Sequence, residues 1–377
     1  MNGDSELRVG YTQHNYNAAR NCYAPVPGVR HVRVGRIPID RLVRPETSIA
    51  LRRGTYVPLG RPRVDVVHLW NQISIGRAPW GVSFESGLPR VPGGRGYSFL
   101  QGRLTATACR FVVGISSFAR DSFLDGLPRE VRQEIEPKTT VVYPHQRANA
   151  STAIVPPSEN EPLKVIFVGG DFFRKGGEAV LRFVERYGSQ YDMQALLIGN
   201  VGSRDWASPW SYDESYVASI RRRLEQEARV SWMSSMPNAQ VLDAMKRSHV
   251  LLFPTLSDTF GYVALEAMSC GLPVVATTVQ AMPEVVDPSV GWTIQLPVGH
   301  DLYWNGFIDD AWASDQDAYE EAMDRIVCGL LQAVEDARAE PEALRARSAC
   351  CLARIASQFG SERTARMKAV YSTSNDP

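Results

Sequence analysis

The stretch 250–276 places a helix between two apolar strands, and this pattern is compatible with few folds. Residues 250–253 are apolar, a polar loop follows, Gly261 precedes a helical segment, and residues 273–276 form a second apolar run. Strand, helix and strand in this order are typical of a βαβ unit, whose two strands lie parallel in one sheet. The sequence therefore predicts an α/β fold with parallel strands.

The polar loop of this unit offers a binding position for an anion and for sugar hydroxyls. Asp258 lies in the loop, Gly261 opens the helix, and Glu266 follows about one turn inside it. A helix N-terminus carries unpaired N–H groups and partial positive charge, which attract phosphate. Carboxylates accept hydrogen bonds in pairs and so suit the vicinal hydroxyls of a sugar or a ribose. The loop is predicted to hold a phosphate beside sugar hydroxyls.

A second junction between strand and helix leads to the same prediction independently. The apolar run 165–168 ends in the glycine pair 169–170, and an amphipathic helix follows after Arg174 and Lys175. A guanidinium binds phosphate oxygens in pairs and an ammonium binds them as a point charge, so this position suits a diphosphate. A lone Arg-Lys pair is more often an ordinary exposed turn. The flanking glycines and the acidic loop favour the phosphate interpretation.

These two segments resemble glycosyltransferase family 4, whose members are retaining, sugar-nucleotide-dependent enzymes of the GT-B fold. The family's strand-loop V-G-R/G-x-x-x-R-K-G is similar to Val168–Gly176. Its E-x7-E motif is similar to Asp258–Val275, with Asp258 in place of the first Glu. The resemblance is specific over residues 164–285 and weak over the first half. It implies an α/β protein with two doubly wound, Rossmann-like domains facing across a cleft.

The resemblance also implies a reaction and the residues that perform it. A hexosyl group would move from a nucleotide-diphosphate sugar to a hydroxyl acceptor with retention of configuration. Arg174 and Lys175 would stabilise charge on the departing phosphate, while Asp258 would hold sugar hydroxyls and Glu266 the nucleotide ribose. The expected catalytic residues are Arg174, Lys175 and Asp258, with Glu85 as a further candidate from the first half. The implied donor-binding residues are Gly169, Gly170, Arg174, Lys175, Asp258, Thr259, Phe260, Gly261 and Glu266.

The first half departs from the family at two strand ends. Residues 11–17 replace a glycine-rich loop, and Glu85 stands near the position where the family often has a histidine. Glu85 either faces the sugar or acceptor in that position or is a capping or salt-bridged acid. His14 is a weaker candidate of the same kind. His68, which ends another expected strand, is interpreted as a satisfied hydrogen-bonding residue.

Cofactors and partners follow from the same chemistry. With two cations on the leaving group no metal is obligatory, and none is expected. The partners that the resemblance implies are a nucleotide-diphosphate sugar and a hydroxyl acceptor, either a saccharide or lipid-linked, and no nucleic acid is expected. Residues 1–144 carry 20 Arg and Lys against 11 Asp and Glu, whereas residues 145–377 carry 21 against 30. This asymmetry indicates either a face for an anionic acceptor or membrane, or an arginine-biased composition.

The chain shows no targeting segment and no apolar run long enough to span a bilayer. Its six cysteines have no metal-ligand spacing. We expect a cytoplasmic protein with free thiols, with peripheral attachment at the inner membrane face as an option.

Strand signals divide the chain into two domains. We expect an acceptor-side domain over 1–150, a linker within 144–162, a donor-binding domain over 163–357, and a last helix, about 358–377, that crosses back. The expected strands are 7–11, 64–68, 81–84, 110–115 and 139–143 in the first domain and 165–169, 194–199, 230–232, 250–253, 274–277 and 292–294 in the second.

An aromatic, acidic insertion at 300–319 interrupts the second domain. It is either a lid or acceptor-contact surface, or a segment anchored to its own domain by its aromatic residues. Asp315, within a D-x-D sequence, is predicted to be a helix N-cap and not a metal ligand.

Two other functions are compatible with these motifs. The chain is alternatively a non-catalytic subunit that binds a nucleotide sugar, since the altered first domain would suit a loss of transfer. It is also compatible with a GT-B epimerase or hydrolase that acts on the sugar nucleotide itself.

Overall fold

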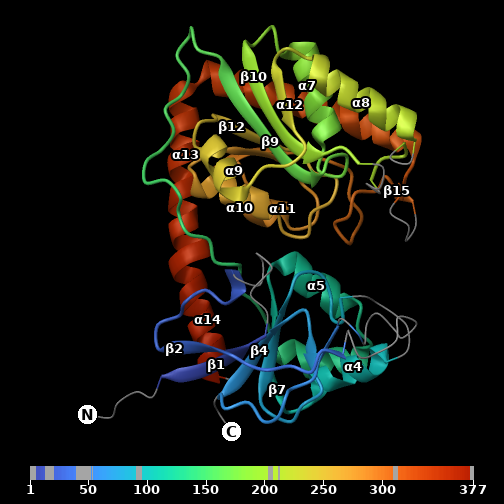
Figure 1. The fold of residues 1–377 in the computed structure, drawn as a ribbon, viewed down its shortest axis with the longest axis vertical. Helices are drawn as coiled ribbons and strands as arrows, with labels where there is room; N and C mark the ends of the chain where they lie inside the picture. The colour runs from blue at the N-terminus through green and yellow to red at the C-terminus, as the bar shows by residue number, and fades with distance from the viewer. Residues whose placement is uncertain are drawn as a thin grey trace. The chain divides into compact units, whose positions relative to one another are not determined.

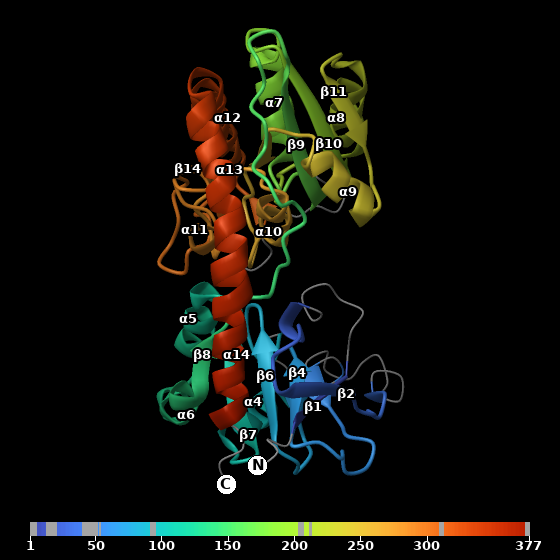
Figure 2. The ribbon, with the colours of Figure 1, turned by 90° about the vertical axis from the view of Figure 1, so that its left-hand side faces the viewer.

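The computed structural model describes residues 6–12, 21–39, 52, 54–90, 96–202, 207–210, 213–308 and 313–373. Residue contacts group the chain into two compact units: unit 1, residues 1–145 and 357–377, and unit 2, residues 146–356. Figures 1 and 2 show both units from two sides. Residues 144–162 contain no helix or strand, as expected of a linker. His14 and most of the stretch 11–17 lie outside the described residues.

Unit 1 is built on a parallel six-stranded sheet in the order β2-β1-β4-β6-β7-β8. Its strands are β1 (Leu7–Tyr11), β2 (Val29–Arg33), β4 (Val66–Trp70), β6 (Trp80–Phe84), β7 (Cys109–Gly114) and β8 (Thr139–Val141). Its helices that lie wholly within the described residues are α4 (Tyr97–Thr105), α5 (Ser117–Asp125), α6 (Arg129–Ile135), the single turns Glu136–Lys138 and Ser357–Ser361, and α14 (Glu362–Thr373). Two short strands, β3 (Thr55–Tyr56) and β5 (Ile73–Ser74), form a separate parallel pair.

Two apolar clusters pack against the sheet of unit 1. One cluster joins strand residues to α4, α5 and α6, for example Trp80 to Leu104 and Phe123. The other joins Val9 and other strand residues to Met367 of α14. Figure 2 shows α14 in red, lying along the strands of this unit. The last helix of the chain therefore completes the core that the first strand begins.

Unit 2 is built on a second parallel six-stranded sheet in the order β11-β10-β9-β12-β13-β14. Its strands are β9 (Leu163–Asp171), β10 (Met193–Asn200), β11 (Val230–Met233), β12 (Val250–Phe253), β13 (Val274–Thr277) and β14 (Gly291–Ile294). Its helices are α7 (Gly177–Tyr187), α8 (Glu214–Gln226), α9 (Asn238–Met245), α10 (Tyr262–Ser269), α11 (Met282–Val285), α12 (Gln316–Ala339) and α13 (Pro341–Ala356). Counted along the chain, this strand order is 3-2-1-4-5-6, the doubly wound order of dinucleotide-binding folds.

The central strands of unit 2 are continuous apolar runs because they are buried. Every residue of β12 and β13 is buried, because helices cover both faces of a parallel sheet. The helices gather in two groups, with α7 beside α12, and α10 beside α9 and α13 (Figure 1). These layers hold the strand ends and their loops at fixed positions.

Most strands expected from the sequence are confirmed. β1, β12 and β13 have the predicted bounds. β4 begins at Val66 and not at residue 64. β2 was not predicted, because it is a half-exposed edge strand with the sequence VRHVR, whose polar residues mask its strand character. Across the described ranges, no helix combines the length and apolar character required to cross a membrane.

The segment 300–319 is anchored to its own unit by buried aromatic side chains. Trp304 is 2% exposed and Tyr319 is fully buried. β15 (Phe307–Ile308) and β16 (Ala313–Ser314) form a short antiparallel pair, and residues 309–312 lie outside the described ranges. Asp315 caps α12 by accepting the backbone N–H groups of residues 317 and 318, which confirms the N-cap prediction.

Candidate functional site

The sheet order of unit 2 defines one preferred binding position. β9 and β12 are neighbours, and the chain winds away from this pair in both directions. In open doubly wound sheets, ligands bind at such a switch point, beyond the carboxyl ends of the strands. The turn after β9 contains Arg174 and Lys175, and the loop after β12 contains Asp258. The predicted cations and one predicted acid thus come from the two strands that flank the switch point.

A single backbone oxygen, the carbonyl of Ser257, brings these residues together. It accepts hydrogen bonds from Arg174 Nη1 at 3.0 Å and from Lys175 Nζ at 3.0 Å. The hydroxyl of Thr255 donates to the same oxygen at 2.8 Å. A backbone bond of 2.8 Å from Leu256 N to Arg174 O also connects the two loops. Hydrogen bonds therefore join the turn after β9 and the loop after β12 into one structural unit.

Lys175 and Asp258 form an ion pair within this structure. Lys175 Nζ lies 2.6 Å from Asp258 Oδ2, and the two side chains are only 11% and 15% exposed. Burial lowers the pKa of Lys175 and outweighs the opposing effect of Asp258. Burial alone would raise the pKa of Asp258, but Lys175 and two backbone N–H groups lower it. The charged form of Asp258 is thus stabilised where the sequence predicts contact with the sugar.

The same carboxylate organises the start of α10. Asp258 Oδ1 accepts the backbone N–H groups of Phe260 at 3.0 Å and Gly261 at 2.7 Å. The side chain of Phe260 is fully buried, whereas Thr259 is partly exposed. Gly261 has a φ of 82°, and a Cβ there would lie 2.6 Å from the sulfur of Met282. Two of the N–H groups expected to meet the donor are therefore engaged by Asp258.

Glycines permit the close approach of the two loops. Gly176 has a φ of 81°, and a Cβ at this position would lie 2.1 Å from the carbonyl oxygen of Pro254. A Cβ on Gly169 would lie 2.5 Å from Cβ of Lys175, so the lysine stem rests directly on this glycine. Gly170, in contrast, is exposed, and a Cβ there would meet nothing within 4 Å.

Arg174 and Glu266 each have a further polar partner in unit 2. Arg174 Nη2 forms an ion pair with Asp171 at the end of β9. Glu266 is partly buried and accepts a hydrogen bond of 3.0 Å from Nδ2 of Asn238. Burial raises the pKa of Glu266, and the bond from Asn238 opposes this rise.

Glu85 belongs to unit 1 and is held there by its own neighbours. It follows β6, is 4% exposed, and its Oε1 lies 2.5 Å from Nη2 of Arg90. The structure thus makes it a salt-bridged acid, one of the two interpretations of this residue. His68 is fully buried between Tyr371 Oη at 2.8 Å and Ser83 Oγ at 2.7 Å, which confirms that its ring is satisfied.

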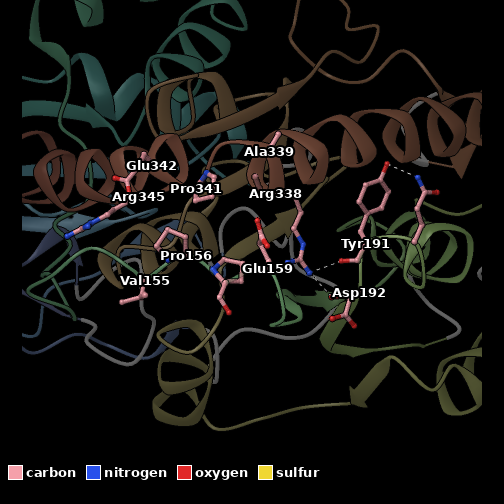
Figure 3. A pocket seen from close by; sticks show the side chains of 14 residues that line it. Val155, Pro156, Glu159, Tyr191, Asp192, Arg338, Ala339, Pro341, Glu342 and Arg345 are labelled. Carbon is pink, nitrogen blue, oxygen red and sulfur yellow. Dashed lines mark hydrogen bonds between the residues drawn. The ribbon is translucent and has the colours of Figure 1, made fainter.

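A cavity of unit 2 lies away from the predicted site residues. It measures about 860 Å³ and is lined by residues 155–159, 190–192 and the junction of α12 with α13 (Figure 3). It adjoins the amino end of β10, opposite to the end where doubly wound sheets bind ligands. In Figure 3, Arg338 reaches the carbonyl oxygens of Tyr191 and Asp192, at 2.8 and 3.0 Å. None of the predicted site residues lines this cavity.

Comparison with known proteins places this site in a family. Residues 152–303 match the family described as glycosyl transferases group 1. This segment belongs to that family. It lies entirely within unit 2 and contains Arg174, Lys175, Asp258 and Glu266. The family resemblance inferred from the sequence is therefore confirmed.

Curated relatives of this group 1 segment carry related names. The gpi3 subunit of phosphatidylinositol N-acetylglucosaminyltransferase from Schizosaccharomyces pombe is 26% identical over 185 residues, which cover 49% of this chain and 37% of that protein. D-inositol 3-phosphate glycosyltransferase from Mycobacterium marinum is 29% identical over 187 residues, with the same coverage of 49% and 37%. The matches thus span little more than a third of these relatives.

Solved structures show the fold over nearly the whole chain. A glycosyltransferase from Rickettsia africae covers 98% of this chain and 98% of its own, with a TM-score of 0.60 and 11% identity. Anabaena HepE, solved in complex with UDP, covers 97% of this chain and 100% of its own, with a TM-score of 0.57 and 12% identity. These proteins have the GT-B fold, and the predicted α/β GT-B class is confirmed.

The role of the Ser257 carbonyl was not predicted, because every residue has a backbone carbonyl and the residue type does not show which one accepts these hydrogen bonds. Gln280, whose side chain bonds Ser257, was also not predicted. Within the described ranges, no three His, Cys, Asp or Glu side chains gather as a metal site. The expectation that no metal is required stays a prediction.

Proposed function

We propose that this chain is a retaining glycosyltransferase that moves a hexosyl group from a nucleotide-diphosphate sugar to a hydroxyl acceptor. The observation that carries the proposal is the cluster at the β9/β12 switch point, where Arg174 and Lys175 both donate to the Ser257 carbonyl and Lys175 pairs with Asp258. The group 1 family match and the glycosyltransferase names of the relatives support it.

The chemistry requires positive charge at this position. When the bond from the anomeric carbon to the phosphate oxygen breaks, the electron pair stays on the diphosphate. Arg174 and Lys175 stabilise that charge, and the low exposure of the lysine strengthens the interaction. A diphosphate would compete with Asp258 for the ammonium of Lys175. The freed carboxylate would then accept sugar hydroxyls, as the sequence predicts.

The remaining roles follow from the family resemblance. The departing phosphate would take the proton of the acceptor hydroxyl as that oxygen bonds to the anomeric carbon on the same face. Glu266 would hold the ribose hydroxyls. The acceptor is a saccharide or lipid-linked hydroxyl, and the basic composition of residues 1–144 suits contact with an anionic membrane surface.

Removal of the cation tests the proposal. The protein is first incubated with UDP-, GDP- and ADP-sugars to identify the donor, and both transfer and slow donor hydrolysis are followed. We expect Lys175→Ala to lower kcat by about 10²- to 10³-fold, as the loss of one charge-stabilising donor does in other enzymes. Glu266→Ala should mainly raise KM for the donor. Lys246→Ala, at an exposed lysine that directly follows α9, is the matched control.

Removal of only one charge of the buried Lys175–Asp258 pair also destabilises the fold, so a second variant is required. Lys175→Met with Asp258→Asn removes both charges and leaves no unpaired ion. This double variant should fold like the parent and remain inactive.

Undiminished activity in Lys175→Ala and Glu266→Ala would refute the proposal. Donor binding by the parent without turnover would favour a binding subunit, and product formation without an acceptor would favour an epimerase or hydrolase.

A further inference from the structure

Two strained backbone positions meet beside the site. Among the described residues, positive φ at a residue other than glycine occurs at Asn71, Asp192, Gln280 (49°) and Leu302 (62°). Gln280 N donates to the carbonyl oxygen of Leu302 at 2.8 Å, so two of these four residues are bonded to each other. Such conformations persist only where the surrounding structure imposes them, and they concentrate at functional sites.

A hairpin imposes the conformation of Leu302. Residues 298 and 304 form an antiparallel bridge, and Asn305 N donates to Pro297 O at 2.9 Å. The tip is a tight turn, in which Leu302 N donates to Gly299 O at 3.0 Å and Gly299 N donates to Tyr303 O at 2.9 Å. Trp304 anchors this hairpin 297–305 in the unit with 2% of its surface exposed. The aromatic segment thus presents a fixed carbonyl group to Gln280.

The side chain of Gln280 connects the hairpin to the site. Gln280 is 2% exposed, and its Oε1 accepts a hydrogen bond of 2.8 Å from the hydroxyl of Ser257. The hydroxyl of Tyr303, in the hairpin, is hydrogen-bonded to the same glutamine side chain. The side chain of Gln280 therefore links Ser257 to the hairpin.

Ser257 is the residue whose carbonyl oxygen receives both cations. Its backbone N–H donates to the hydroxyl of Thr255 at 3.2 Å and its own hydroxyl donates to Gln280, so the residue is held from two sides. Its carbonyl oxygen then faces Arg174 and Lys175. A change at Gln280 would turn Ser257 and shift both cations without removing either charge.

We infer that Gln280 is a positioning residue, which transmits the conformation of the hairpin 297–305 through Ser257 to the cations Arg174 and Lys175. It follows that the aromatic insertion serves the phosphate-binding part of the site. The inference rests on the proposed function of these cations and deepens it.

The substitution Gln280→Gly separates backbone strain from side-chain function. Glycine adopts positive φ without strain, so it keeps the loop conformation while it deletes the amide. We expect its melting temperature to stay within about 3 °C of the parent, because relieved strain offsets lost hydrogen bonds. Asp192→Gly is the matched control, since it relieves the same kind of strain at the amino end of β10, away from the site.

Binding is measured by calorimetry with UDP, GDP and ADP, and the nucleoside of the diphosphate that binds is titrated by NMR. We expect Gln280→Gly to weaken diphosphate binding by roughly three- to tenfold, the effect of about one hydrogen bond, and to leave nucleoside binding unchanged. Asp192→Gly should change neither. Ser257→Ala combined with Gln280→Gly should bind no more weakly than the worse single variant, because the two changes break one connection.

The outcomes of these binding measurements distinguish failure of the inference from failure of the proposed function. Parent-like diphosphate binding by Gln280→Gly, or equal loss for nucleoside and diphosphate, would overturn the inference and leave the proposed function intact. Additive losses in the Ser257/Gln280 double variant would also overturn it. If the parent binds none of the three diphosphates, the proposed function itself fails, and the inference fails with it.

Discussion

At the scale of single residues, the site is held together by the mutual neutralisation of Lys175 and Asp258. The sequence assigns one to the phosphate and the other to the sugar, and the structure pairs them at 2.6 Å. Each charge lowers the cost of burying the other. The shorter Asp258, where the family commonly has Glu, still reaches both the ammonium and two backbone N–H groups. The pair thus preorganises the loop that a donor would meet.

Two adjacent glycines give a prediction at this scale. A Cβ on Gly169 would collide with the stem of Lys175, whereas one on Gly170 would meet open space. We expect Gly169→Ala to displace the ammonium, to weaken nucleoside diphosphate binding and to lower the free energy of unfolding by about 1 to 3 kcal/mol. Gly170→Ala should leave stability unchanged to within about 0.5 kcal/mol.

Calorimetry and denaturant unfolding check both variants. If Gly170→Ala folds normally but loses donor binding, the donor occupies the space beside this residue, as the sequence predicts. Parent-like binding and stability in Gly169→Ala would show that the lysine stem does not depend on this close approach.

At the scale of elements, the amino ends of β9 and β12 are joined by one histidine. His249 N donates to Lys164 O at 2.8 Å, and Lys164 N donates to His249 Nδ1 at 3.0 Å. The second bond requires a neutral acceptor nitrogen. Burial, followed by the nearby positive charges of Lys164 and Arg338, lowers the pKa of His249 from 6.5 to about 4. Protonation of Nδ1 would break the bond that it accepts from Lys164 N.

A pH dependence of stability follows. Since the pKa of His249 is lower in the folded state, its contribution is fully present above pH 6.5 and is lost as the pH falls towards 4. With allowance for partial exposure, we expect a loss of about 1 to 2 kcal/mol over this range. His249→Asn keeps an acceptor near Nδ1 but does not titrate, so its unfolding free energy should fall less. Urea unfolding at pH 7 and pH 4.5 measures the difference, and parallel losses in both proteins would contradict this role.

The same elements show how far sequence reasoning reaches. β12 and β13 were predicted with their observed bounds, because buried parallel strands are continuous apolar runs. The edge strand β2 was not predicted, because its residues are exposed or only partly buried and polar residues interrupt its apolar pattern. Arg174, Lys175 and Asp258 were predicted from charge and spacing. The roles of the Ser257 carbonyl and the strained Gln280 depend on backbone geometry, which a residue pattern does not encode.

At the scale of the whole molecule, the two units differ in how strongly the comparisons define them. The family match covers residues 152–303, within unit 2, where the proposed donor site lies. Beyond this segment, the comparison with solved structures extends over nearly the whole chain at 11 to 12% identity and therefore shows only the fold. The comparisons therefore define the fold of unit 1, and the family of a segment in unit 2.

Unit 1 depends on the last helix of the chain. Met367 of α14 is 1% exposed among Val9, Phe111 and other strand residues, while Lys368 beside it is exposed. We expect Met367→Ala to destabilise unit 1 by about 2 to 5 kcal/mol, because it leaves a cavity against the sheet. Hydrogen exchange should accelerate in β1 and β7 and stay unchanged in β9 and β10 of unit 2. Lys368→Ala should change neither, and equal effects of both substitutions would show that α14 contributes no core to unit 1.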